Sequence, residues 1–135
     1  MNNYIKFTRN KIIIITKYLF YISNIFLIIF YLYPGSIFGC LIYNDCKTQP
    51  QLTSDFIVSS NHVYVFIIIS FLGFISYSKK SSLIWAIYYL FFISFFLELL
   101  HLYIPERGFE VKDLAGNITG VVISLIIFKL WKKNE

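Results

Sequence analysis

Four long apolar runs dominate this sequence and restrict what the chain can fold into. A helix needs roughly 17 to 25 mostly apolar residues to cross a hydrocarbon core about 30 Å thick. The runs cover residues 12–33, 62–77, 83–104 and 114–131, and each is long enough, or nearly so, to be such a span. The sequence therefore predicts an all-α integral membrane protein, with four transmembrane helices that form a bundle and a single domain over residues 1–135.

Composition supports the same prediction and excludes a soluble globule. Hydrophobic residues make up 58% of the chain and charged residues 14%, whereas soluble domains carry roughly a quarter charged residues. The breaks between the apolar runs contain turn residues and charges: Pro34 with Gly35, Lys79 with Lys80, and Pro105. The first run is longer than the apolar stretch of a signal peptide and lacks a typical cleavage site, so we expect it to be a membrane span.

The distribution of basic residues predicts the direction of the spans, because Lys and Arg near span ends are retained in the cytoplasm. With both termini and the turn near residue 80 placed inside, nine of the twelve basic residues lie inside: Lys6, Arg9, Lys11, Lys17, Lys79, Lys80, Lys129, Lys132 and Lys133. Only Lys47, Arg107 and Lys112 then lie outside. Both termini are thus predicted to be cytoplasmic. Positive charge at membrane borders, without a nucleic-acid motif, excludes nucleic acid as the partner.

The two cysteines, Cys40 and Cys46, fall in the first loop predicted to be outside. A disulfide is chemically permitted if this loop faces an oxidising compartment, and two free thiols are the alternative. Two cysteines alone make no metal site. The neighbouring apolar patch of Ile37, Phe38, Leu41 and Ile42 is expected to dip into the membrane interface.

Five polar functional groups gather at the predicted outer ends of the last two spans, in a chain that otherwise avoids them. Glu98 and His101 are three residues apart, and Asp113 and Asn117 are four apart, so each pair shares a helix face. A carboxylate near the membrane is costly unless it is paired or hydrated, which makes such a group a functional candidate. We expect a polar pocket between the second, third and fourth spans near the outer face.

Each neighbouring residue has a predicted role. Arg107 is expected to pair with Glu98 or Asp113, or to hold a phosphate, because a guanidinium binds either with two parallel hydrogen bonds. Asp113 is also placed to be the N-cap of the last helix. Gly116 and Gly120 form a small-x-x-x-small pair that favours close helix packing.

A metal site is conceivable but is not predicted. Glu98 and His101 have the Glu-x-x-His spacing of di-iron bundles, but those bundles need two such pairs and further carboxylates. A mixed site of Glu98, His101, Asp113 and His62 would suit zinc, iron or manganese. The simpler interpretation is a hydrogen-bonded histidine at a helix end for His101 and a residue at the water boundary for His62. We therefore expect no metal and no other cofactor.

The order of these residues is similar to a known signature. Glu98-x-x-His101-x-x-x-Pro105-x-Arg107, followed by Asp113-x-x-x-Asn117-x-x-Gly120, resembles the E-x-x-Q, P-x-R and D-x-x-x-N-x-x-G pattern of VanZ-like membrane proteins. His101 stands at the usual Gln. An earlier D-K-x-x-H-F element of that family would place Asn61 at the Asp, His62 at the Lys and Val65 at the His.

The resemblance implies a small protein of the bacterial inner (plasma) membrane, similar to proteins associated with resistance to the glycopeptide teicoplanin. It implies no known reaction. We expect the bilayer and a lipid-linked precursor of the cell envelope as partners, and the oligomeric state stays open.

Three hypotheses for the function follow. In the first, the outer polar groups bind or shield an envelope component, with Arg107, Asp113, Asn117, Asn61 and His62 as ligand-binding candidates. In the second, the protein is a membrane enzyme acting on a lipid-linked phosphate, with Glu98 or Asp113 as general base and His101 as acid. In the third, the polar groups only hold the helices together. We favour the first.

Overall fold

The computed structural model describes residues 2–134, except for the side chains of residues 2–6 and 8. The Lys6 side chain, which the topology prediction places inside, is therefore outside the described part. The described residues form five helices and no strand: α1 (Asn2–Leu32), α2 (Ile37–Tyr43), α3 (Ser60–Ser76), α4 (Lys80–Leu100) and α5 (Val111–Lys133). The all-α prediction is confirmed.

Three of the helices are long and apolar enough to cross a membrane: Arg9–Leu32 within α1, and all of α4 and α5. The fourth apolar helix, α3, has 17 residues. At a rise of 1.5 Å per residue it is about 25 Å long, slightly less than a typical hydrocarbon core. A span of that length is accommodated when the bilayer thins locally around it. Its crossing of the membrane stays a prediction.

The largest differences from the predicted span bounds are at two helix ends. Helix α1 begins at Asn2, ten residues before the predicted span starts at Ile12, and so includes the basic N-terminal segment. Helix α4 ends at Leu100, four residues before the predicted span ends at Ile104. There the amide groups of His101, Leu102 and Tyr103 bond carbonyls three residues back instead of four, at 3.2, 3.1 and 3.0 Å. This tighter winding ends the α-helix ahead of Pro105.

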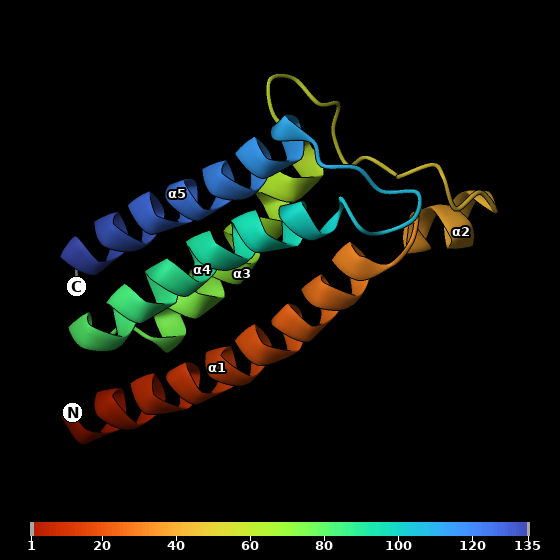
Figure 1. The fold of residues 1–135 in the computed structure, drawn as a ribbon. Coiled ribbons are helices and arrows are strands. Elements are labelled where there is room, and N and C mark those ends of the chain that lie inside the picture. Colours follow the sequence, from red (N-terminus) through yellow and green to blue (C-terminus); the bar gives the residue numbers. More distant parts are fainter. Residues whose placement is uncertain (1, 135) are drawn as a thin grey trace.

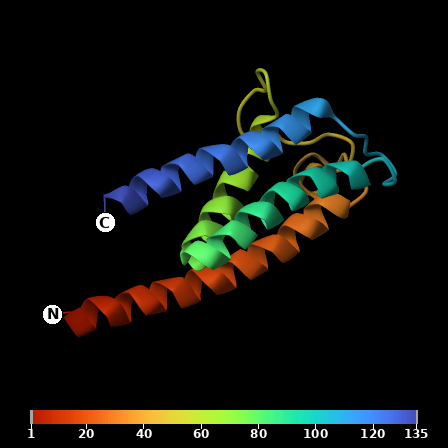
Figure 2. The ribbon, with the colours of Figure 1, turned by 60° about the vertical axis from the view of Figure 1, so that its left-hand side comes forward.

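The four long helices lie side by side, with both termini at one end of the bundle and α2 with the long loops at the other (Figures 1 and 2). Helix α3 packs most extensively against α5. A Cβ atom added at Gly116 would lie 2.7 Å from the Ser59 carbonyl oxygen, and one at Gly120 would lie 2.6 Å from that of Val63. The two glycines therefore serve packing within the chain.

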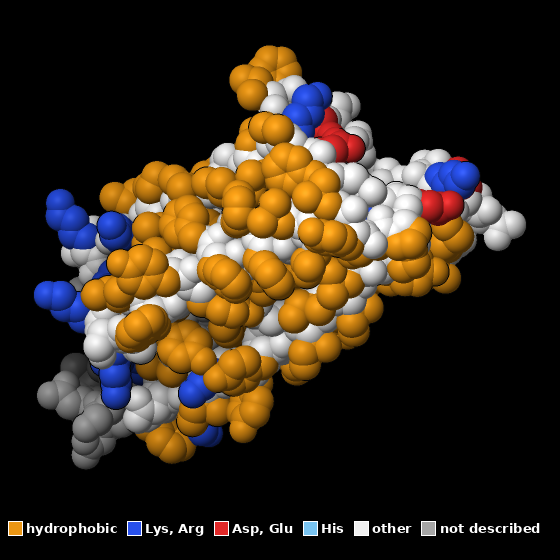
Figure 3. All heavy atoms as spheres, in the orientation of Figure 1, with side chains coloured by type: hydrophobic (Ala, Val, Ile, Leu, Met, Phe, Trp, Pro, Cys, Tyr) orange, Lys and Arg blue, Asp and Glu red, His pale blue; other side chains and the backbone are white. Residues whose placement is uncertain are grey.

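Large apolar side chains cover the surface of the bundle as well as filling its core. Core side chains such as Phe66, Leu90 and Phe128 are fully or almost fully buried, while large apolar side chains also point outwards along every long helix, among them Trp85 at 74% exposure. Lys and Arg side chains gather at the end that carries the termini (Figure 3). An apolar exterior is typical of a protein whose solvent is lipid.

The predicted apolar patch of the first loop forms helix α2. Its N-cap is Ser36, whose hydroxyl accepts a bond from the Gly39 amide at 3.0 Å. Cys40 and Cys46 form a disulfide, and the Ser36 amide donates to the Cys46 carbonyl at 2.7 Å. Gly35 has a φ of +79°, and a Cβ there would lie 2.5 Å from that carbonyl oxygen. Because only glycine fits such a position, Gly35 allows the chain to turn tightly from α1 into the cystine loop.

Candidate functional site

Six side chains from all four long helices meet at the loop end of the bundle. We call them the polar cluster: Tyr31, His62, Glu98, His101, Asp113 and Asn117. Five of them are at most 7% exposed, and Asp113 is partly buried. The two spaced pairs found in the sequence thus face each other inside the bundle. His62, expected at the water boundary, is buried with them.

Asn117 connects α5 to the other three long helices. Its amide nitrogen donates to the Ser94 carbonyl of α4 at 3.1 Å. Since a carbonyl can only accept, this bond fixes the orientation of the amide. The Asn117 Oδ1 atom then accepts from the Tyr31 hydroxyl of α1 at 2.6 Å and lies 3.0 Å from His62 Nδ1 of α3.

Glu98 and His101 form a buried pair at the end of α4. His101 Nε2 donates to the Tyr31 carbonyl at 3.0 Å, and Nδ1 lies 3.3 Å from Glu98 Oε1. The same oxygen accepts the amide of Glu110 at 3.0 Å. Because Nε2 carries the proton that bonds the Tyr31 carbonyl, Nδ1 is the nitrogen that faces Glu98.

Asp113 faces His62, with 3.4 Å between Oδ2 and Nε2. The prediction that Asp113 is the N-cap of its helix is wrong. Helix α5 begins at Val111, so Asp113 is its third residue and Glu110 is the N-cap, without a side-chain capping bond. The carbonyl of Glu110 accepts the amides of Asp113 and Leu114, each at 3.1 Å, which starts the helix one turn earlier than Asp113 would have done.

Arg107 makes contacts other than those predicted. Its guanidinium donates to the carbonyls of Phe30 and Tyr33 at the end of α1, at 3.3 and 3.4 Å, and to the Gln49 side chain at 3.5 Å. Within the described residues it forms no ion pair with Glu98 or Asp113, because both carboxylates point towards histidines.

The charge of Arg107 is partly shielded from solvent. Burial lowers the pKa of the guanidinium from its usual value, while Tyr31, Asp113 and Glu98 raise it again by Coulomb attraction. An arginine stays protonated at any working pH. Arg107 is thus a positive group whose hydrogen bonds are long and go only to uncharged acceptors.

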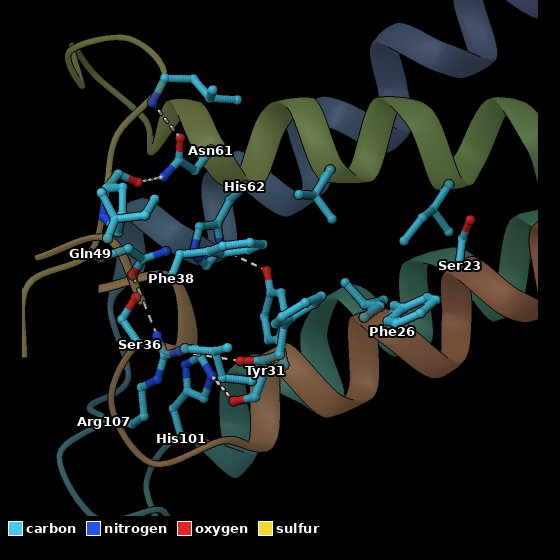
Figure 4. A pocket seen from close by; sticks show the side chains of 18 residues that line it. Ser23, Phe26, Tyr31, Ser36, Phe38, Gln49, Asn61, His62, His101 and Arg107 are labelled. Atoms are coloured by element: carbon cyan, nitrogen blue, oxygen red, sulfur yellow. Dashed lines mark hydrogen bonds between the residues drawn. The ribbon is translucent and has the colours of Figure 1, made fainter. Parts of the chain in front are cut away.

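A cavity of about 510 Å³ lies beside the polar cluster, between α1, α2 and α3. Arg107, His101 and His62 line it near the loops, and Ser23 and Phe26 line it further along α1, away from Arg107 (Figure 4). The rest of the lining is mainly apolar: Leu27, Phe30, Ile37, Phe38, Ile42, Leu52, Val65 and Ile69. The pocket predicted between the second, third and fourth spans is therefore displaced towards the first, because the polar cluster itself fills that space.

Three of the five predicted ligand-binding residues line this cavity, namely Arg107, His62 and Asn61. The Asn61 amide is already used, since it donates to the Pro50 carbonyl at 2.7 Å and accepts the Leu52 amide at 3.0 Å. It holds the loop that lines the cavity. Asp113 and Asn117 lie behind His62 and do not line the cavity.

Two residues of the site were missed by sequence reasoning. Tyr31 bonds three members of the polar cluster through its hydroxyl and carbonyl groups, and Gln49 contacts Arg107. Tyr31 is one of eleven tyrosines, and Gln49 lies in a polar loop. No spacing distinguishes either residue from its neighbours.

Comparison with known proteins agrees with the signature found in the sequence. The model of the family described as VanZ/LLP1 matches residues 5–132, nearly the whole chain. No curated protein and no solved structure matches the chain.

Proposed function

The chain belongs to the VanZ/LLP1 family, and we propose that it is a four-span protein of the bacterial inner membrane that binds an anionic envelope lipid in the cavity beside Arg107. Both termini lie in the cytoplasm, as the distribution of basic residues predicts. The cavity then opens at the outer leaflet, where lipid-linked precursors of the cell envelope are used.

The observation that carries the proposal is the position of Arg107 at the loop end of a cavity whose lining is mainly apolar. Its guanidinium has only carbonyl and amide oxygens as partners within the described residues. A phosphate oxygen is a stronger acceptor for it, and binds it with two parallel bonds. The ligand class is therefore a phosphate or pyrophosphate headgroup.

The length of the cavity supports a lipid rather than a free phosphate. Along α1 the lining extends from Ser23 to Tyr31, a rise of about 12 Å. Phe26, Leu27 and Ile69 give this part an apolar wall that suits a hydrocarbon chain. A polyprenyl-linked peptidoglycan precursor has both a pyrophosphate group and a hydrocarbon chain. Binding of such a precursor in this cavity would connect the protein to glycopeptide resistance.

The geometry favours binding over catalysis. In a general acid or base, one imidazole nitrogen must face the ligand. His101 uses Nε2 for the Tyr31 carbonyl and Nδ1 for Glu98. His62 directs Nδ1 at Tyr31 and Asn117, and Nε2 at Asp113. Both histidines are therefore held in place by the protein on both sides of the ring.

Replacing Arg107 by alanine is expected to weaken binding of a polyprenyl phosphate strongly. The variant keeps the apolar cavity but loses the charge and the paired donors, and one charge-assisted contact contributes roughly 1.5 to 3 kcal/mol, or about 10- to 150-fold in affinity. Binding is measured by fluorescence titration of the purified protein in uncharged detergent, with the uncharged polyprenol as reference ligand.

Lys112→Ala is the matched control, because it removes one positive charge from the same end of the bundle and does not line the cavity. It is expected to bind like the wild type. A purely structural role for Arg107, as a donor to the last carbonyls of α1, predicts instead that Arg107→Ala lowers the folded yield. Normal yield with unchanged binding by Arg107→Ala would refute the proposal.

A further inference from the structure

Three groups from three helices converge behind the cavity wall. A ring nitrogen of His62, a carboxylate oxygen of Glu98 and one of Asp113 all lie within 4.8 Å of one another. We propose that these three side chains bind one divalent transition-metal ion, for which zinc is the best match. The site is separate from Arg107 and goes beyond the proposed lipid binding.

The first argument is an unused ligand atom. Glu98 is 0% exposed. Its Oε1 lies 3.3 Å from His101 Nδ1 and accepts the Glu110 amide, whereas Oε2 has no hydrogen-bond partner within the described residues. A fully buried carboxylate oxygen without a partner is costly. A cation held jointly with His62 and Asp113 would satisfy it.

The second argument is the arrangement around His62. A histidine that binds a metal through one nitrogen commonly donates its other N–H to a protein oxygen. The bond to Ser94 fixes Asn117 with Oδ1 towards His62 Nδ1, 3.0 Å away, so Nδ1–H can donate to it. Nε2, which faces Asp113 at 3.4 Å, is then the nitrogen that would bind the metal.

The third argument is spacing. His62 Nε2 and Asp113 Oδ2 are 3.4 Å apart. Two ligand atoms at about 2.0 to 2.1 Å from one tetrahedral ion are separated by roughly 3.3 to 3.4 Å. These two atoms are therefore already at the distance that a shared ion requires, and rotation of the Glu98 carboxylate completes the triad.

The donor set selects the type of metal. One imidazole and two carboxylates, with a fourth position left for water, match zinc and also suit manganese or iron. Calcium needs six to eight oxygen ligands, and magnesium prefers oxygen and water. This inference revises the expectation of no metal. That expectation rested on the lack of a second Glu-x-x-His pair. In the structure both nitrogens of His101 face protein groups, and the histidine ligand is His62 of α3.

The test is a zinc titration of the full-length protein, purified without a polyhistidine tag and stripped with a chelator, in competition with a chromophoric zinc indicator. One equivalent of zinc is expected to bind. Loss of a residue that only orients a metal ligand typically weakens metal binding roughly 10- to 100-fold. Glu98→Gln and Asp113→Asn each remove a ligand itself, so each is expected to weaken zinc binding by more than that. Cobalt is expected to give the d–d absorption of a tetrahedral site in the wild type only.

Glu106→Gln is the matched control, because Glu106 is an exposed glutamate at the same end of the bundle, paired with Lys47 at 4.0 Å. It should bind zinc like the wild type, and so should Arg107→Ala, which separates this test from that of lipid binding. If Glu98→Gln does not fold, Asp113→Asn carries the comparison, since Asp113 is partly exposed. Wild-type protein that binds no stoichiometric zinc, or binding that neither substitution weakens, would overturn the proposal.

Discussion

Replacing Gly120 by leucine is expected to destabilise the protein by more than about 3 kcal/mol. A Cβ at this position would lie 2.6 Å from the Val63 carbonyl oxygen and 2.7 Å from Phe66 Cβ. Leucine favours a helix over glycine by about 0.8 kcal/mol, but overpacking a helix contact with a whole side chain costs more than that gain. Helices α3 and α5 would have to separate. Unfolding in mixed detergent micelles, followed by circular dichroism, measures the change.

Gly108 provides the control for this substitution. It lies in the loop between α4 and α5, and a Cβ there would meet no atom within 4 Å. Gly108→Leu is expected to change the free energy of unfolding by no more than about 0.5 kcal/mol, as is usual for a surface substitution. Equal effects at Gly120 and Gly108 would show that the α3–α5 contact is not close in the membrane.

Replacing Asn117 by leucine, whose side chain has the same number and branching of heavy atoms, is expected to destabilise the protein by about 2 to 4 kcal/mol. The substitution removes the partner of the Tyr31 hydroxyl, of the Ser94 carbonyl and of His62 Nδ1 at once. Single interhelical hydrogen bonds in membranes contribute roughly 0.6 to 1.7 kcal/mol. Three lost together, on three different helices, give the expected range. The same unfolding assay measures it.

Tyr31→Phe provides the comparison, because it removes only the hydroxyl that bonds Asn117 and His62. It is expected to cost less than Asn117→Leu, and the double variant less than the sum of the two single variants, because both remove the same bond. If the two effects simply add, Tyr31 and Asn117 act independently and the polar cluster is not one network.

Sequence reasoning reached the helical class and the two spaced pairs because both depend on local periodicity. Apolar runs of membrane length define helices, and residues three or four apart share a helix face. Glu98 and His101 are hydrogen-bonded, and Asp113 and Asn117 both contact His62, as that geometry implies. Helix ends differ from the predicted span bounds because helix ends depend on hydrogen bonding that hydropathy does not report, such as the tighter last turn of α4.

The partners of each polar group could not be predicted, since they depend on how the helices pack. Arg107 is six residues from Asp113 in the chain, yet it reaches back to the end of α1. Tyr31 belongs to the polar cluster because α1 places its hydroxyl against His62 of α3 and Asn117 of α5. The cavity, too, depends on helix α2 and its disulfide, which the sequence left open.

The polar cluster and Arg107 differ in their contacts. Asn117, Tyr31 and the two histidines join the four long helices through buried hydrogen bonds, and Tyr31, His62 and His101 form one wall of the cavity. Arg107 stands at the cavity's loop end without an ion-pair partner in the described residues. A rigid wall beside an available charge is the arrangement expected for selective binding of an anionic headgroup.

The most direct test of this account is photo-crosslinking in vesicles with an anionic phospholipid that carries a diazirine in its acyl chain, followed by mass spectrometry of the labelled peptides. The account predicts label on the cavity-lining parts of α1 and α3, around Phe26, Leu27, Val65 and Ile69, and its loss from this region in Arg107→Ala or with a phosphocholine lipid. Label spread evenly over the lipid-facing sides of all helices, and unchanged in Arg107→Ala, would contradict it.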